Sequence, residues 1–203
     1  IGLFTSAYLG LLPGYVFDLF LYAALLINTA ITVLCLKNKQ AHFSWLNKSG
    51  LTLFYLLGSS LFIPLLIAQS KDGAPYYLLF FYLSIWVNNS FAYLIGSQIG
   101  KTKLLPAISP KKSWEGYAGG AFATLILLYF VENNFSLYGL YWWSIALLLP
   151  ALATLGDFVQ SYFKRRANVK DSGKLLPGHG GFYDRMDSVI YTAPFYYLLL
   201  KII

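Results

Sequence analysis

Long apolar stretches dominate this sequence and restrict its fold more than any other feature. Hydrophobic residues make up 58% of the chain and charged residues only 11%, whereas about 25% of the residues in a soluble domain are charged. Such a chain cannot cover itself with polar surface in water, so we expect lipid around it. Backbone groups in lipid must be hydrogen-bonded within their own segment. We therefore predict an all-α fold, a polytopic membrane helix bundle.

Six stretches have roughly the 20 apolar residues that one membrane crossing requires. They are Tyr15–Leu36, Leu51–Gln69, Tyr76–Gly96, Gly116–Val131, Tyr138–Leu155 and Ser188–Ile203. The fourth and sixth are short as drawn, and we expect them to extend into their flanks. No internal repeat, low-complexity tract or linker interrupts the chain, so residues 1–203 are predicted to form a single integral membrane domain.

The connecting loops alternate in charge. Basic residues follow the first, third and fifth stretches, and only Lys71 and Lys201 lie elsewhere. They are Lys37, Lys39 and Lys48, then Lys101, Lys103, Lys111 and Lys112, then Lys164, Arg165, Arg166, Lys170, Lys174 and Arg185. The positive-inside rule places these loops in the cytoplasm and both termini on the other side. Because the charges lie between apolar spans, the net charge of +7 does not indicate nucleic-acid binding.

Most of the polar side chains lie in residues 156–187. Asp157 ends the fifth apolar stretch, and an ionisable residue at membrane depth is a functional hypothesis by default. If the helix continues, Asp157, Ser161 and either Lys164 or Arg165 share one face. Asp184 and Asp187 are three residues apart and would share a face where the sixth span begins. Carboxylate and hydroxyl oxygens are ligands suited to Mg²⁺.

A glycine-rich loop separates these two groups of carboxylates. Residues 173–181 contain four glycines, which let backbone N–H groups approach an anion closely. Hard oxygen ligands, basic side chains and such a loop together indicate phosphoryl or nucleotidyl transfer.

A second polar segment precedes the fourth span. Ser109 followed by Pro110 predicts a helix N-cap with proline at the first helical position. Lys111 and Lys112 would then lie in a first turn, where the helix dipole disfavours cations. A bound phosphate would resolve that conflict, because helix N-termini attract anions. The alternative is that these lysines only set the membrane topology.

A third polar group, Asn88-Asn89-Ser90, lies near the middle of the third span. Three adjacent polar side chains cannot all face lipid. They either form hydrogen bonds between helices or line a polar cavity.

Residues 161–187 resemble the signature of the phosphatidate cytidylyltransferase family, also called CDP-diacylglycerol synthases. The segment 108–120 is similar to a second block of that family, and Asn89 with Ala92, Tyr93 and Gly96 to a third, although the family usually carries Asp at position 89. The signature matches at Ser161, Lys164, Arg165, Lys170, Asp171, Pro177, His179, Gly180, Gly181, Asp184, Arg185 and Asp187.

The resemblance implies that CTP and phosphatidic acid react to give CDP-diacylglycerol and pyrophosphate, with Mg²⁺ and room for a second cation. It also implies a bacterial inner membrane with the site facing the cytoplasm, and it is compatible with a homodimer. The expected metal ligands are Asp157 and Asp184, followed by Asp187, and Asp171 and Ser161 complete the expected catalytic set. The expected phosphate-binding residues are Lys111, Lys112, Lys164, Arg165, Lys170, Arg185, His179, Gly180 and Gly181.

Other functions stay open at this point. A CTP-dependent synthase of CDP-isoprenoid lipids or a polyprenol kinase would use similar residues. A catalytically impaired lipid-binding paralogue would fit the asparagine at position 89. A transporter is disfavoured because the charges gather at one membrane face and no inverted repeat is present.

Overall fold

A computed structural model describes residues 14–37, 54–69, 75–169, 172–173, 181 and 183–202. The chain divides into two compact units, one formed by Ile1–Leu79 with Ala193–Ile202 and one by Phe80–Thr192 with Ile203. Almost all described residues are helical, which confirms the predicted all-α membrane fold apart from one small β-hairpin. The single-domain prediction stays a prediction.

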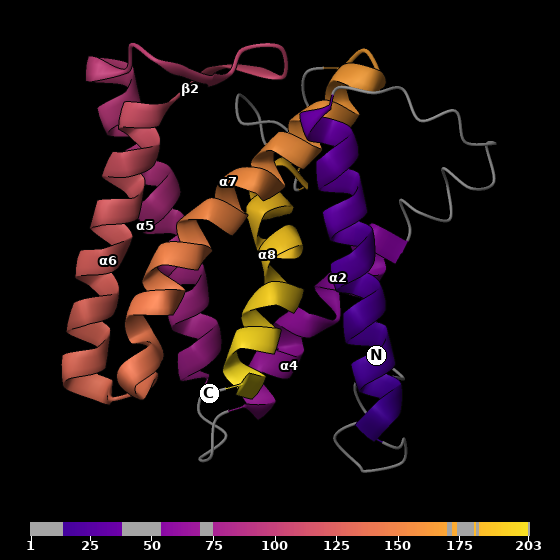
Figure 1. Cartoon of the computed structure of the whole chain (residues 1–203), viewed down its shortest axis with the longest axis vertical. Helices are drawn as coiled ribbons and strands as arrows, with labels where there is room; N and C mark the ends of the chain where they lie inside the picture. Colours follow the sequence, from indigo (N-terminus) through magenta and orange to yellow (C-terminus); the bar gives the residue numbers. More distant parts are fainter. Residues whose placement is uncertain are drawn as a thin grey trace. The chain divides into compact units, whose positions relative to one another are not determined.

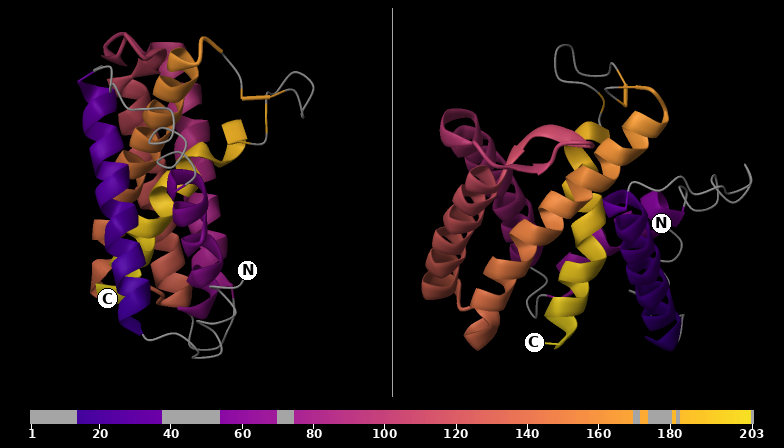
Figure 2. Two further views of the ribbon diagram at one scale, coloured as in Figure 1. Left: turned by 90° about the vertical axis from the view of Figure 1, so that its right-hand side faces the viewer. Right: turned by 45° about the horizontal axis from the view of Figure 1, so that its top comes forward.

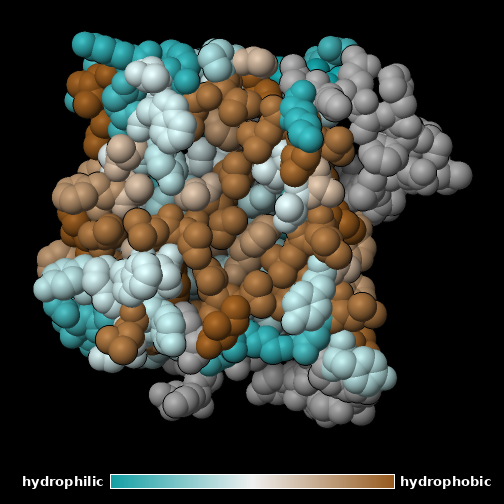
Figure 3. Space-filling view, viewed as in Figure 1, coloured by the Kyte–Doolittle hydropathy of each residue, from teal (hydrophilic) through white to brown (hydrophobic). Residues whose placement is uncertain are grey.

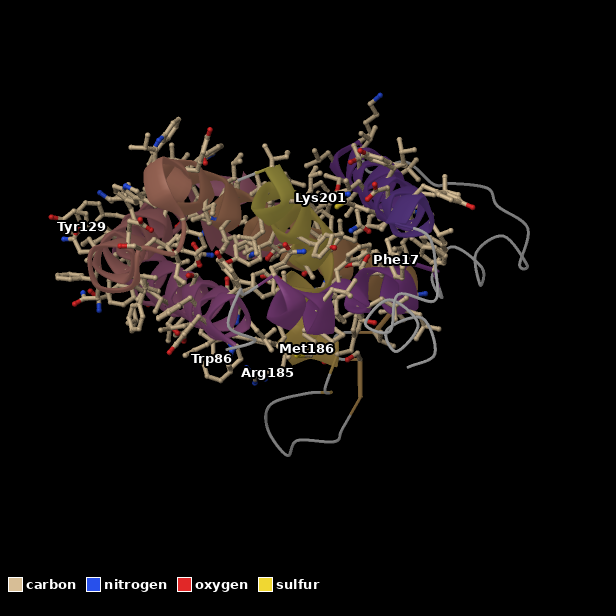
Figure 4. The ribbon with its side chains drawn as sticks, turned by 90° about the horizontal axis from the view of Figure 1, so that it is seen from below. Phe17, Trp86, Tyr129, Arg185, Met186 and Lys201 are labelled. Carbon is tan, nitrogen blue, oxygen red and sulfur yellow. The ribbon has the colours of Figure 1, made fainter. Side chains whose placement is uncertain are left out.

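The first unit contains α2 (Gly14–Leu36), the π-helix η1 (Phe54–Gly58), α4 (Phe62–Ala68) and the last turns of α8 (Tyr183–Ile202). Asn28 of α2 is fully buried, and its amide donates to the hydroxyl of Ser59 at 3.2 Å. Near the chain's C-terminal end, Lys201 pairs with Asp18, and Figure 4 labels this lysine. Such side-chain bonds satisfy polar groups where lipid offers no partner.

The second unit contains the candidate site. Its elements are α5 (Tyr76–Ile99), β1 (Lys103–Leu105), β2 (Ser109–Ser113), α6 (Trp114–Phe135), the 3₁₀-helix η2 (Gly139–Tyr141), α7 (Trp142–Arg166) and the start of α8. The strands form an antiparallel hairpin that pairs Lys103 with Ser113 and Leu105 with Ser109, with an irregularity between the pairs. Figures 1 and 2 show the hairpin reaching from the ends of α5 and α6 toward α7.

Glycines allow α5 and α6 to pack closely. A Cβ atom placed on Gly116 would lie 2.6 Å from the carbonyl oxygen of Ala92, and one on Gly120 would lie 2.5 Å from that of Asn88. No side chain fits at either position, so the two backbones approach each other directly. Small residues serve this purpose at helix crossings in membranes.

Four described helices are long and apolar enough to cross a membrane: Tyr15–Leu36, Tyr76–Ile99, Trp114–Phe135 and Gly139–Arg166. Figure 3 shows hydrophobic residues over the middle turns of α6 and α7 and hydrophilic ones at their ends. The predicted span Leu51–Gln69 instead contains a shorter apolar helix, Phe54–Ile67, and α8 carries charged residues at both ends. The count of about six spans and the side of the termini therefore stay predictions.

The predicted start of the fourth helix is wrong. Ser109 and Pro110 lie in strand β2, and α6 begins only at Trp114. Ser113 is the N-cap, with an extended backbone and a hydroxyl that accepts the Gly116 N–H at 3.2 Å. Proline is tolerated at the edge of a two-stranded ribbon, and a serine directly before the helix supplies the cap that Ser109 is too distant to provide. Lys111 and Lys112 are therefore strand residues.

The α5–α6 contact predicts a stability difference between two adjacent glycines. Gly120→Ala should lower the free energy of unfolding by about 1–3 kcal/mol, because the new methyl group collides with the α5 backbone. Gly119→Ala should have a smaller effect, since a Cβ there first meets the tip of the Ile95 side chain. Thermal unfolding of both variants in detergent measures the difference, and equal stabilities would contradict the packing described.

Candidate active site

Helix α7 carries the first group of polar side chains. It continues past the predicted end of its span to Arg166, so Asp157, Ser161 and Lys164 lie on successive turns. The hydroxyl of Ser161 donates to Asp157 at 3.4 Å. The conditional prediction that these residues share one helix face is confirmed.

The hairpin supplies Lys112 to this face. The Lys112 ammonium group lies 2.5 Å from Asp157 and 4.9 Å from the centre of the Phe158 ring. The neighbouring Lys111 is exposed while Lys112 is half-buried, and adjacent side chains of a strand point to opposite sides. The two lysines that the sequence grouped together thus face different surroundings.

Asp187 lies near the Lys112–Asp157 pair. It is 9% exposed and accepts the Ser188 backbone N–H at 2.6 Å. Burial raises the pKa of Asp187, the nearby charge of Asp157 raises it further, and the Ser188 N–H with Lys112 and Lys164 only partly opposes them. Two carboxylates close enough to influence each other favour a bound cation.

Asp184 has a different environment. Its carboxylate accepts hydrogen bonds from the Lys164 ammonium at 2.9 Å and the Gln160 amide at 3.1 Å. It also accepts bonds from the Ser172 backbone and hydroxyl at 2.8 Å each and from the Gly181 N–H at 2.9 Å. Burial raises the pKa of Asp184, but these donors lower it by more, so it lies well below the usual range. Asp184 therefore holds the two described ends of the glycine-rich loop.

We call Lys112, Asp157, Lys164, Asp184 and Asp187 the polar site. Of the other predicted residues, Arg165 and Arg185 are exposed, and Figure 4 shows Arg185 at the outer edge of α8. Gly181 does not present its N–H to an open site, because Asp184 accepts it. Lys170, Asp171, His179 and Gly180 lie outside the described residues.

Sequence reasoning missed Gln160 and Ser172, both of which bind Asp184. Gln160 is fully buried and stands one turn after Asp157. A glutamine within that apolar helix was a usable signal. Ser172 gave none, because its contact with Asp184 depends on how the loop folds.

Polar residues of α5 and α6 that the sequence singled out have structural contacts. The Glu115 carboxylate accepts the backbone N–H groups of Lys101 and Thr102 at 3.1–3.2 Å and so closes the base of the hairpin. The Asn88 amide donates to Asn89 at 3.1 Å, and the Asn89 amide donates to the Ser188 hydroxyl at 3.5 Å. These bonds favour the helix–helix interpretation of the asparagines.

The polar site is compatible with Mg²⁺. Among the described residues no three His, Cys, Asp or Glu side chains gather closely enough to hold a metal ion by themselves. Mg²⁺, however, is usually bound by one or two carboxylates together with substrate phosphates. Asp157 and Asp187 supply two carboxylates of this kind, with Lys112 already beside Asp157, whereas both oxygens of Asp184 accept hydrogen bonds from the protein.

Comparison with known proteins agrees with this chemistry. Residues 2–203 match the model of the cytidylyltransferase family. This chain belongs to the cytidylyltransferase family. A phosphatidate cytidylyltransferase of Rickettsia typhi (strain ATCC VR-144 / Wilmington) is 34% identical over 207 residues, which cover 95% of this chain and 91% of the relative.

Two longer cytidylyltransferase relatives match in part, and both are named phosphatidate cytidylyltransferase. The protein of Staphylococcus aureus (strain COL) is 45% identical over 136 residues, 65% of this chain and 52% of the relative. That of Aquifex aeolicus (strain VF5) is 39% identical over 158 residues, 75% of this chain and 56% of the relative. The chain thus spans about half the length of these two relatives.

The hydrogen bonds to Asp184 predict a local effect on amide exchange. Asp184→Asn should speed hydrogen exchange at the Ser172 and Gly181 amides by roughly tenfold, because their charged acceptor becomes neutral. Asp157→Asn is the matched control, since no described loop amide donates to Asp157. Exchange followed by mass spectrometry measures both variants. Equal protection in the two would contradict the assigned role of Asp184.

Proposed function

We propose that this chain transfers the cytidylyl group of CTP to phosphatidic acid, giving CDP-diacylglycerol and pyrophosphate. The observation that carries the proposal is the Lys112–Asp157 pair beside Asp187, which joins the hairpin, α7 and α8 at one polar site. Family membership and the printed names of the relatives support the choice of CTP and a phosphatidate.

The reaction needs little proton transfer. A phosphate oxygen of phosphatidic acid, already anionic near neutral pH, attacks the α-phosphorus of CTP. The bond from the α-phosphorus to the oxygen that bridges it to the β-phosphate breaks, and that oxygen leaves with the pyrophosphate. Catalysis then consists mainly of alignment and neutralisation of negative charge. Neither a nucleophilic serine nor a histidine base is required.

The residues of the polar site divide these tasks. Lys112 reaches the site from the hairpin and supplies positive charge beside Asp157. Lys164 is bound to Asp184, which holds Ser172 and Gly181, so this pair fixes the described ends of the loop. Lys170, Arg165, Arg185 and His179 remain further candidates for phosphate contacts.

Asp157 and Asp187 would hold Mg²⁺. When bound, the ion supplies charge neutralisation for the triphosphate and the leaving pyrophosphate. Such an ion would offset the repulsion between the two carboxylates, which Lys112 and Lys164 oppose only in part.

The location follows from the two substrates. Phosphatidic acid lies in the leaflet with its headgroup at the surface, and CTP arrives from water. The basic loops and the positive-inside rule support a site facing the cytoplasm, at the inner membrane of a bacterium.

A labelled-nucleotide assay tests the proposal. Purified protein in detergent receives Mg²⁺, phosphatidic acid and CTP labelled either at the α- or at the γ-phosphate. Label from the α-phosphate alone should enter the lipid, and pyrophosphate should be released. Transfer of γ-label would indicate a lipid kinase, product only with an isoprenoid phosphate would indicate a CDP-isoprenoid synthase, and no transfer would indicate an inactive paralogue.

Two adjacent lysines provide a matched pair for a kinetic prediction. Lys112→Gln should lower kcat/KM for CTP by at least about tenfold, because a positive charge beside the reacting phosphates is lost. Lys111→Gln should change it by less than about twofold, as expected for an exposed side chain directed away from the carboxylates. Steady-state kinetics of the two variants decide the matter, and equal losses would mean that strand orientation is irrelevant to catalysis.

The loop-holding role of Asp184 gives a further expectation. Asp184→Ala should abolish formation of the CDP-lipid while the protein stays folded, because the described ends of the loop lose their acceptor, together with the side chains of Lys164 and Gln160, while the backbone bonds of α7 and α8 are unchanged. Activity and thermal unfolding are measured on the same preparation. Full turnover in this variant would remove Asp184 from the site.

A further inference from the structure

Helix α7 contains a glycine directly before Asp157. Gly156 lies in the interior of a helix, where glycine costs roughly 1 kcal/mol relative to alanine. A residue that local propensity disfavours needs a reason in the tertiary structure. Gly156 is buried, so this reason lies in what it contacts.

The contact is with the first turns of α8. A Cβ atom placed on Gly156 would lie 3.0 Å from the Cα of Ser188 and 2.7 Å from the Cβ of Tyr191. The Ser188 Cα is a backbone atom and the position of the Tyr191 Cβ is fixed by its backbone, so a change of side-chain rotamer would not relieve either contact. Tyr191 is 2% and Ser188 1% exposed, and neither position has open space beside it.

This crossing lies one residue away from each of the two interacting carboxylates. Asp157 follows Gly156 on α7, and Asp187 precedes Ser188 on α8. The Ser188 N–H donates to Asp187 at 2.6 Å, so the carboxylate is attached to the residue that touches Gly156. Asn89 of α5 contacts the Ser188 hydroxyl at 3.5 Å and restrains the same residue from another helix.

We infer that Gly156 is a positioning residue whose missing side chain sets how closely Asp157 and Asp187 approach. With any larger residue, α8 must move away from α7 at Ser188, and Asp187 moves with it. A pair of carboxylates that holds one divalent cation tolerates little change in separation. This inference rests on the proposed function and deepens it, because the separation between the Asp157 and Asp187 carboxylates matters only if they bind the cation.

The test uses Mn²⁺ as a spectroscopic probe in place of Mg²⁺. Binding of Mn²⁺ to the purified protein in detergent, without CTP or lipid, is followed by electron paramagnetic resonance. Gly156→Ala should weaken Mn²⁺ binding by about tenfold. Gly119→Ala, a glycine-to-alanine change on α6 outside the site, should bind Mn²⁺ within about twofold of the unmodified protein.

A rescue experiment separates spacing from general damage. Asp157→Glu adds one methylene and should weaken Mn²⁺ binding where Gly156 is kept, because the longer side chain changes the separation that Gly156 sets. In the Gly156→Ala background the longer side chain should instead restore binding several-fold relative to Gly156→Ala alone. Such a sign change in a double-mutant cycle shows coupling between the two positions.

Three outcomes would overturn the inference. They are unchanged Mn²⁺ affinity in Gly156→Ala, an equal loss from Asp157→Glu in both backgrounds, and absence of Mn²⁺ binding by the unmodified protein. If Gly156→Ala does not stay folded, Asn89→Ala probes the Ser188 position without added volume. It should weaken Mn²⁺ binding about threefold, and unchanged affinity would then overturn the inference.

The two experiments distinguish failure of the proposed function from failure of the role given to Gly156. If the unmodified protein binds Mn²⁺ and Gly156→Ala weakens that binding, but no CMP reaches phosphatidic acid in the labelled-nucleotide assay, the spacing role stands and the assigned reaction does not. If CDP-lipid forms but Gly156→Ala leaves the Mn²⁺ affinity unchanged, the assigned reaction stands and the spacing role of Gly156 does not.

Discussion

The need to pair polar groups inside apolar helices governs the second unit of this protein. In lipid an unpaired charge or amide is costly, so polar side chains favour partners within the protein. Lys112 and Asp157 satisfy each other across the hairpin and α7, Asp184 collects its donors from α7 and the loop, and Asn89 reaches Ser188. The same bonds that satisfy these groups also fix the geometry of the polar site.

Two of the three aspartates have separable tasks. Asp184 is surrounded by donors that keep it ionised and hold the ends of the loop. Asp187 is buried near a like charge, and both effects raise its pKa. Within one turn of α8, the carboxylate of Asp184 thus binds protein donors, and that of Asp187 is suited to a ligand. From their spacing in the sequence alone, Asp184 and Asp187 were expected to have the same role.

The sequence predicted the parts of this structure that depend on local pattern. Apolar length located the helices, and helical periodicity placed Ser161 on the same face as Asp157. Prediction from the sequence failed where the structure depends on contacts between distant segments. Ser109 and Ser113 are both plausible caps, and only pairing of the hairpin strands selects Ser113. Gln160 was indicated by its polar side chain within an apolar helix. The Gly156–Ser188 contact, in contrast, joins segments too far apart for any local pattern to indicate it.

The alternation of side chains in the hairpin has a consequence for how this segment can evolve. Lys112 faces the carboxylates and Lys111 faces outward only because strand β2 is paired in one register with β1. Ser113 stays paired with Lys103 at the base of the hairpin, so gain of a single residue between Lys112 and Ser113 would move Lys112 to the place of Lys111, because side chains in a strand have a period of two. The turn between Leu105 and Ser109 can therefore vary in identity more freely than β2 can vary in length.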